Sequence, residues 1–381
     1  MGLQRIYINK LPISINSLIR QFTNKITLLS KLSITRNSSI IVFGIIISNL
    51  LGYVFHIIVG RALGPADYGE FGALISLYLI IALPASALSS AVTKYSAKYN
   101  AKKEFSKIGA LRNSLGRKTL IFGIFLFFVI VVLSIPLSGY LKVSASSIII
   151  VGITLIFSLI LPINRGVLQG MKKFKILSVN NILEAAFRLA LAFVFIFLGF
   201  KANGAVLAYG LAYLLAFIFI FPYIKETKSG ENLEKSELGK IYKFVFIVLI
   251  ANLVIQLIIN LPTLFIKHAY SAEFTGLWTA ALTLARVSLF VTGGITIVMF
   301  PEVAEKDNHK DKKAVFNKAL LLTLVVSVGA ALCFILFGNL AITILYGKTY
   351  LSAVPILEWM GLAMIPLGIL QLWVNYLVAG R

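Results

Sequence analysis

The chain has 381 residues, of which 59% are hydrophobic and only 13% are charged. A water-soluble protein of this length carries more charge on its surface, so the composition argues against a soluble globular fold. Lys and Arg number 36 against 14 Asp and Glu, which gives a formal net charge of +22. An apolar chain with such an excess of basic residues is typical of membrane-spanning helices joined by basic loops. The single cysteine, Cys333, excludes an intramolecular disulfide and a cysteine-based metal cluster.

Ten apolar runs are long enough to cross a membrane, because a helix needs about 20 residues to span a hydrocarbon core of about 30 Å. Seven of the runs contain no Asp, Glu, Lys or Arg: Asn37–Gly60, Phe71–Thr93, Thr119–Leu141, Val143–Asn164, Ala202–Ile224, Phe244–Ile266 and Ala319–Gly347. Three more hold charge within the run: Ile176–Phe200, Phe274–Pro301 and Thr349–Gly380. We therefore expect an all-α, polytopic membrane protein with about ten transmembrane helices.

Basic residues alternate along these runs. The segment before the first run and the even-numbered loops together hold 28 Lys and Arg, whereas the odd-numbered loops hold 5. By the positive-inside rule, the N-terminus and the even-numbered loops are expected in the cytoplasm. We expect the protein to lie in the plasma (inner) membrane. The charge is spread over five separate segments without an aromatic-rich basic patch. It therefore favours contact with membrane lipids and predicts no nucleic-acid partner.

A basic segment, residues 1–37, precedes the first run. It holds six basic and no acidic residues, and its apolar stretches are too short for the hydrophobic region of a signal peptide. The pattern leaves two interpretations, an interfacial amphipathic helix or a disordered tail.

The sequence contains a long internal repeat. The stretch ADYGEFGAL, from Ala66 to Leu74, corresponds to AEFTGLWTA, from Ala272 to Ala280, at an offset of 206 residues, and the same offset brings the first apolar run onto the seventh. Two units of six spans have the same orientation in the membrane, an arrangement found in transporters. We expect a first lobe of six helices at 38–224, a cytoplasmic linker at 225–243 and a second lobe at 244–381. The second lobe has four of its six spans, so we expect either a fragment or a naturally shortened protein.

Similarity to a known family is carried by three stretches: VGRALGPADYGEFGALISLYLIIALP (Val59–Pro84), NRGVLQGMKKF (Asn164–Phe174) and LYGKTYLSAVPIL (Leu345–Leu357). They resemble polysaccharide biosynthesis proteins, the Wzx-type lipid-linked oligosaccharide flippases, within the larger multidrug and oligosaccharidyl-lipid exporter superfamily. The resemblance implies a MATE-like fold of 12 to 14 helices in two lobes, with a V-shaped central cavity that opens alternately to either side. This chain departs from that pattern by having ten spans.

A fourth stretch, LARVSLFVTGGITIVMFPEVAE (Leu284–Glu305), resembles the eighth helix of lipid II flippases. In that helix an arginine faces the transport cavity, and Arg286 occupies its place here. The same resemblance puts Asp67 at the position of an acidic residue that starts the second helix. It therefore implies that both residues contact substrate.

Arg286 lies twelve positions after Phe274, near the middle of its predicted helix. An arginine at that depth costs about 2.5 to 3.5 kcal/mol on insertion scales, so it normally faces a bundle interior or a watery cavity. Because a guanidinium matches the geometry of phosphate oxygens, we expect Arg286 to receive the pyrophosphate of a polyprenyl-linked sugar. The alternative is a structural ion pair, for example with Glu358.

Three more charged residues are candidates for substrate contact. Glu184 and Arg188 are four residues apart, so they share one helical face and can neutralise each other; a purely structural pair is the alternative. Arg165 follows Pro162 at the cytoplasmic end of the fourth run. It can meet a lipid-linked headgroup or extend to the membrane surface, and the second is favoured.

Glu358 and His56 are candidates for ion coupling. Glu358 has no basic residue one turn away, so it can bind a proton or Na⁺ unless it pairs with Arg286 or Arg188. His56 is more often a packing residue than a proton relay. Four polar residues either line the cleft or form interhelical hydrogen bonds, of which the second is the more frequent: Asn49, Asn252, Gln256 and Asn260.

The sequence holds no nucleophile motif, phosphate-binding glycine loop or metal-ligand spacing. We therefore predict no enzymatic activity, no cofactor and no metal site. The predicted function is that of a flippase that moves a polyprenyl-pyrophosphate-linked oligosaccharide to the outer leaflet. A drug/cation antiporter is the alternative within transport, and a non-transporting scaffold for glycan-assembly enzymes is the alternative outside it.

Overall fold

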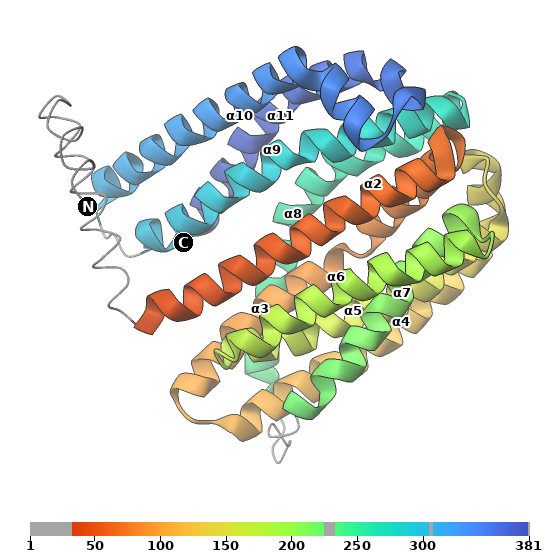
Figure 1. Ribbon diagram of the computed structural model, residues 1–381. Coiled ribbons are helices and arrows are strands. Elements are labelled where there is room, and N and C mark those ends of the chain that lie inside the picture. Colours follow the sequence, from red (N-terminus) through yellow and green to blue (C-terminus); the bar gives the residue numbers. More distant parts are fainter. Residues whose placement is uncertain (1–32, 225–232, 305–307, 380–381) are drawn as a thin grey trace, which may run out of the picture.

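The computed structural model describes residues 33–224, 233–304 and 308–379, and within these ranges it contains helices and no β-strand. Figure 1 shows the chain as a bundle of long helices. In chain order they are α2 (Ser33–Ile81), α3 (Leu83–Ala101), α4 (Phe105–Leu141), α5 (Ala145–Gly170), α6 (Phe174–Phe197), α7 (Lys201–Ile220), the 3₁₀-helix η2 (Phe221–Ile224), α8 (Lys235–Ala269), α9 (Ala272–Ala304), α10 (His309–Leu345), the 3₁₀-helix η3 (Lys348–Ala353) and α11 (Val354–Ala379). The prediction of an all-α protein is confirmed. The predicted basic segment 1–37 lies outside the described residues, apart from its last five positions.

Helix α2 is a hairpin of two helical segments. Gly64 has a φ of 70° and a ψ of 174°, which is not helical, and Pro65 follows it. Glycine adopts a positive φ without a steric penalty, and proline has no N–H to continue the helix. The ring centroids of Phe55 and Phe71 are 5.8 Å apart, whereas sixteen residues of straight helix would span about 24 Å. The chain therefore reverses its direction at Gly64.

The second crossing of the bundle runs from the end of α2 into α3. The break between them is at Ala82, because Pro84 stands in the first turn of α3. Within the described residues, length and composition mark nine candidate membrane spans, and the first of them, Phe43–Ile81, contains the hairpin. Because this hairpin accounts for one additional crossing, the structure agrees with the ten predicted runs.

The outer surface of the bundle is apolar, as a lipid-facing surface must be. On α4, the side chains of Val132 and Ile135 are 75% and 76% exposed, and Phe128 is 61% exposed. Exposed apolar surfaces of this kind are rare in soluble proteins and mark contact with a membrane or a partner. Together with the candidate spans, they identify a multi-pass membrane protein.

The helices form two groups that meet along α2 and α9 (Figure 1). In the first group, α2 packs on α6 and α7, and α5 packs on α3, α4 and α7. In the second group, α9, α10 and α11 pack on one another. We call the end of the bundle where α2 reverses the turn end; it also holds the short connections Lys142–Ser144, Leu198–Phe200, Tyr270–Ser271 and Tyr346–Gly347.

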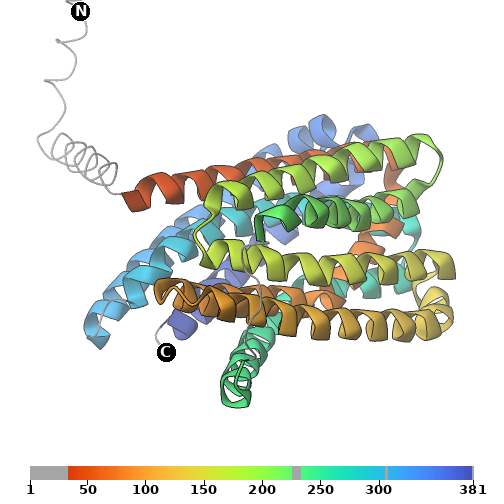
Figure 2. The same cartoon turned by 90° about the horizontal axis from the view of Figure 1, so that it is seen from below.

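Helix α8 lies against the first group more than against the second. It packs extensively on α2 and α3 and much less on α9 and α11, and Figure 2 shows it inclined to the other helices. Near its start, Glu237 pairs with Lys98 at 3.8 Å, and Lys94 lies 4.1 Å from the centre of the Phe244 ring. Because α8 begins at Lys235, the last part of the predicted linker 225–243 is helical. The boundaries predicted for the two lobes stay a prediction.

The two copies of the internal repeat pack against each other. Gly69 and Gly72 of the first copy face Gly276 and Thr279 of the second. A Cβ atom at Gly276 would collide with the carbonyl oxygen of Pro65, and one at Gly72 would collide with the Thr279 side chain. Small residues at these positions let α2 and α9 approach closely. This glycine seam, made of Gly69, Gly72 and Gly276, joins the two groups of helices at the turn end.

Candidate functional site

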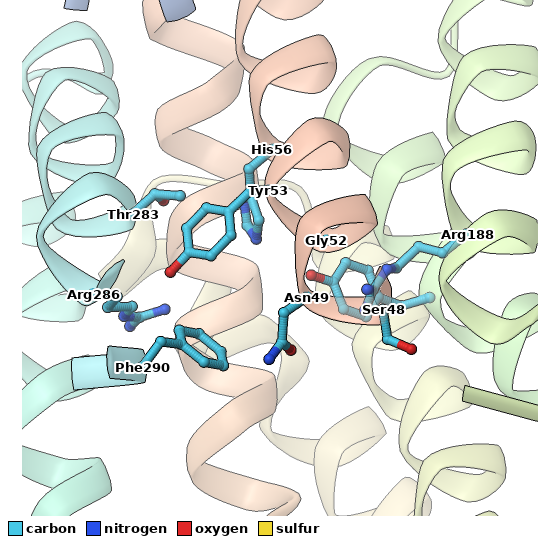
Figure 3. A pocket seen from close by; sticks show the side chains of 10 residues that line it. Ser48, Asn49, Gly52, Tyr53, His56, Arg188, Thr283, Arg286 and Phe290 are labelled. Carbon is cyan, nitrogen blue, oxygen red and sulfur yellow. The ribbon is translucent and has the colours of Figure 1, made fainter. Parts of the chain in front are cut away.

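A cavity of about 240 Å³ lies where the two groups of helices meet. Its walls come from α2, α6, α7 and α9, and Figure 3 shows Arg286 and Arg188 approaching from opposite sides of α2. Both of its charged residues are cationic. The lining consists of Ser48, Asn49, Gly52, Tyr53, His56, Arg188, Tyr209, Thr283, Arg286 and Phe290.

The lining on α2 follows one helical face. Ser48, Gly52 and His56 are four residues apart, as are Asn49 and Tyr53, so all five project from the same side of the helix. Gly52 leaves room for Arg188, whose Nη2 would lie 3.5 Å from a Cβ atom at that position. The five residues therefore form a continuous and mainly polar strip along the cavity.

Arg286 has one hydrogen-bond partner within the described residues. Its Nη2 donates to Oδ1 of Asn260 on α8 at 2.8 Å. Its Nε is buried without a partner, and no described carboxylate lies within ion-pair distance. An unpaired cation with an unsatisfied N–H is costly to bury, and each such group calls for an explanation. Arg286 therefore keeps one N–H group without a partner at the cavity wall.

Arg188 is held by one carboxylate and two aromatic rings. Its Nη1 lies 3.4 Å from Oε1 of Glu184, one turn earlier on α6. The guanidinium carbon lies 4.5 Å from the centre of the Tyr209 ring and 5.4 Å from that of Phe55, distances typical of cation–π contacts. Its Nε is buried without a hydrogen-bond partner. Arg188 thus resembles Arg286 in offering an unused N–H group at the cavity.

Arg165 lies behind this pair and does not line the cavity. Its Nη1 is 3.7 Å from Oε2 of Glu184, and its Nε donates to Oδ1 of Asn180 at 2.7 Å. The Asn180 amide in turn donates to the Ala216 carbonyl on α7 at 2.7 Å. The Arg165 side chain is only 17% exposed. The predicted extension to the membrane surface is therefore wrong, because a carboxylate and an amide inside the lobe supply the partners that water would have offered.

The four polar residues predicted for the cleft separate into two groups. Asn49 lines the cavity. Asn260 instead holds Arg286 and donates to the Gln256 side chain, one turn earlier on α8, at 2.7 Å. Asn252 lies 3.4 Å from the Ser86 hydroxyl of α3. Asn49 therefore lines the cavity, Asn252 and Asn260 bond to other helices, and Gln256 bonds to Asn260 within α8.

The two predicted acidic candidates outside α6 are not brought to the cavity. Asp67 lies just after the turn of α2 and pairs with Lys201 at 3.3 Å, where both side chains are accessible. Glu358 lies in the second turn of α11 and is partly exposed. In the described residues it forms no ion pair with Arg286 or Arg188, so that alternative for Arg286 is wrong. The orientation of α9 about its own axis places the Arg286 side chain toward α8, where it donates to Asn260.

On the turn-end side of the cavity, a tyrosine hydroxyl joins α2 to the second group. The Tyr68 hydroxyl lies 3.4 Å from Thr283 Oγ1 and 3.3 Å from the Tyr346 hydroxyl. It also lies 3.2 Å from Nδ1 of His56, which lines the cavity. His56 is therefore a neighbour of this closed end. Its predicted role in ion coupling stays a prediction.

A second set of contacts closes the turn end further out. The Tyr350 hydroxyl donates to the Gly60 carbonyl at 2.6 Å. Arg61 donates to the carbonyls of Leu345, at 2.8 Å, and Ile344, which lie at the C-terminal end of α10. A cation is favourable at that position because helix carbonyls carry partial negative charge there. These bonds tie the turn of α2 to α10 and η3.

Comparison with known proteins agrees with this architecture. The family described as polysaccharide biosynthesis protein matches residues 34–306. The chain belongs to that family. It is 20% identical to a putative O-antigen transporter of Shigella flexneri over 358 residues. The alignment covers 89% of this chain and 85% of the relative. The matched range includes both copies of the internal repeat.

Solved structures show that this member of the polysaccharide biosynthesis protein family has the MOP superfamily fold. An inward-facing multidrug resistance MATE family transporter matches with a TM-score of 0.70 at 14% identity, covering 87% of this chain and 83% of that one. The lipid II flippase MurJ, in an inward closed conformation, also matches with a TM-score of 0.70 at 14% identity, over 89% and 76% of the two chains. An outward-facing MATE family transporter gives 0.58 at 16% identity, over 91% and 84%.

Proposed function

We propose that this protein is a flippase that moves a polyprenyl-pyrophosphate-linked oligosaccharide from the cytoplasmic to the outer leaflet by alternating access. Family membership and the MOP fold support transport of a lipid-linked glycan, since the relatives include a putative O-antigen transporter and a lipid II flippase. The proposal adds the pyrophosphate, the route through the cavity and the direction.

The observation that carries the proposal is the pair of buried arginines in one cavity. Arg286 and Arg188 each keep an N–H group without a hydrogen-bond partner, and both line the same space. Phosphate oxygens are the acceptors that a guanidinium fork fits best. The unpartnered Tyr53 hydroxyl adds a neutral donor beside them.

The size of the cavity supports binding of a headgroup. A volume of about 240 Å³ is below the range of about 300 to 1,000 Å³ typical of sites that enclose a whole drug-sized ligand. It accommodates the two phosphates and leaves the polyprenyl tail in the membrane. The glycan then occupies space that opens between the groups of helices when they move apart.

A drug/cation antiporter shares the fold, as the MATE structures illustrate. Its cargo is cationic, and the sign of the charge in this cavity disfavours that cargo. Among the residues that the structure describes, no acidic side chain lines the cavity, whereas two arginines do. We therefore favour transport of an anionic cargo over cation antiport.

Translocation of a fluorescent polyprenyl-pyrophosphate-linked sugar in reconstituted vesicles tests the proposal. We expect Arg286→Gln to reduce the rate at least about tenfold, because charged pairs in close contact contribute about 1.5 kcal/mol or more. Arg117→Gln is the matched control, since Arg117 is an exposed arginine on α4 outside the cavity. Normal translocation by Arg286→Gln would remove the arginine pair from the mechanism. Efflux of a cationic dye without sugar-lipid transport would favour the antiporter.

The same vesicles separate transport from scaffolding. A scaffold for glycan-assembly enzymes would give no translocation with the purified protein alone. Empty vesicles set the background rate. Translocation by the wild-type protein above that background would exclude the scaffold as its sole role.

A further inference from the structure

Three buried ionic side chains form a row from the cavity wall into the first group of helices. Arg188 lines the cavity, Glu184 lies behind it, and Arg165 lies behind Glu184. Oxygen Oε1 of Glu184 faces Arg188 at 3.4 Å, and Oε2 faces Arg165 at 3.7 Å. All three side chains are at most 17% exposed. One carboxylate is therefore shared between two guanidinium groups.

Arg165 is fixed by partners other than Glu184. Its Nε and Nη2 donate to the side chain and the backbone carbonyl of Asn180, at 2.7 and 3.4 Å. Asn180 is itself anchored to the Ala216 carbonyl of α7. This support holds the guanidinium beside Glu184 without requiring the ion pair. The row is thus a built feature, and the charge of Glu184 can be removed while these hydrogen bonds remain.

The row decides how much positive charge reaches the cavity. A Glu184–Arg188 pair alone would be neutral, because each side chain cancels the other. Arg165 adds a second cation, and guanidinium groups are always protonated in proteins. Counted with Arg286, three arginines and one glutamate give the cavity and its wall a net charge of +2. Without Arg165 this charge would be +1.

We infer that Arg165 is a positioning residue that sets the charge of the cavity, and that this charge selects a pyrophosphate-bridged over a phosphate-bridged lipid-linked sugar. A sugar joined to a polyprenol through a phosphodiester carries one negative charge, whereas a pyrophosphodiester carries two. Charge matching inside a low-dielectric site discriminates between such ligands more strongly than it does in water. The inference rests on the proposed function and assigns specificity to a residue that does not touch the cargo.

The test compares two probes that differ only in the bridge: farnesyl pyrophosphate-linked and farnesyl phosphate-linked N-acetylglucosamine. Binding to the purified full-length protein gives a ratio of the two affinities. Arg165→Gln should lower the preference for the pyrophosphate probe about tenfold, the size of one lost charge contact. The double variant Arg165→Gln/Glu184→Gln has the wild-type net charge and should restore the ratio to within about twofold.

Two further variants separate charge from packing. Arg165→Lys keeps the charge but loses the forked contact with Asn180, and it should keep the wild-type ratio. Glu184→Gln alone raises the net charge to +3 and should increase the preference for the pyrophosphate probe. This variant also tests the inference if Arg165→Gln does not fold, as judged by size-exclusion chromatography. Arg117→Gln serves as the control for a general loss of surface charge.

Each outcome decides one question. A double variant that is as impaired as Arg165→Gln, or a Glu184→Gln ratio equal to that of the wild type, would show that Arg165 acts through structure and would overturn the inference. The proposed function fails separately, if Arg188→Gln and Arg286→Gln bind both probes as well as the wild type does. If those two variants lose binding while Arg165→Gln keeps the wild-type ratio, only the inference fails.

Discussion

Asn260 sets the position of Arg286. It is fully buried, accepts from Arg286 at 2.8 Å and donates to Gln256 at 2.7 Å, so one amide uses both of its ends. Neutral hydrogen-bond partners orient a guanidinium without cancelling its charge. A carboxylate in the same place would have held Arg286 equally well but would have closed the site to an anion.

We expect Asn260→Ala to impair translocation because Arg286 loses the partner that positions it. Loss of the amide leaves a buried charged donor without its partner, which costs about 1 to 3 kcal/mol. Thermal unfolding in detergent should show the lower stability, and translocation should fall severalfold. A double-mutant cycle with Arg286→Gln should be strongly non-additive. Asn252→Ala is the control, because Asn252 donates to the Ser86 hydroxyl at 3.4 Å on α3 and does not contact Arg286 among the described hydrogen bonds; equal losses in the two alanine variants would contradict the assignment.

The sequence identifies the buried charges but not their partners. Arg286 and Arg188 are conspicuous because each interrupts an apolar run, and both line the cavity. Their neighbours depend on how each helix is rotated, which a short list of polar residues cannot determine. Arg286 meets Asn260 instead of Glu358, and Arg165 turns inward to Glu184.

Aromatic lining residues are still harder to predict from sequence. Tyr53, Tyr209 and Phe290 resemble ordinary apolar positions of a membrane helix. A signal was nevertheless available on α2, where Ser48, Gly52 and His56 repeat every four residues. Such a strip of small and polar residues predicts the face of a helix that lines a cavity.

At the scale of the elements, the internal repeat has a direct physical expression. Its two copies are the two helical segments that meet in the glycine seam of Gly69, Gly72 and Gly276. The apolar runs predict the crossings themselves because hydrocarbon thickness sets the length of a span. The inclination of α8 toward α2 and α3 is not encoded in any run, since it depends on packing between distant helices.

The seam predicts that added volume at Gly276 is destabilising. A Cβ atom there would meet the backbone at Pro65, which cannot move aside as a flexible side chain can. We expect Gly276→Ala to lower the free energy of unfolding by about 1 to 3 kcal/mol, the usual cost of overpacking. Thermal unfolding in one detergent measures the difference. Gly329→Ala in α10 is the matched control, because open space surrounds that glycine; its effect should be neutral or stabilising by up to about 1 kcal/mol.

At the scale of the whole molecule, the contacts between α2 and the second group are unevenly distributed. In the described residues, every side-chain hydrogen bond from α2 to α9, α10 or η3 comes from the stretch between Gly60 and Tyr68. The glycine seam follows directly after it. One end of the bundle is therefore closed by specific bonds and close packing. The proposed alternating access requires these contacts to separate when this end opens.

A covalent link across the seam should therefore stop transport. Gly72 and Thr279 face each other closely enough that cysteines at both positions can form a disulfide after a small shift. The pair belongs in a Cys333→Ala background, because Cys333 is exposed. Oxidation should abolish translocation of the pyrophosphate-linked sugar, and a reductant should restore it, whereas the oxidant should leave the rate of either single-cysteine variant unchanged. Full translocation by protein whose crosslink is complete on a gel would mean that the turn end stays shut throughout the cycle, and that the cargo leaves by another path.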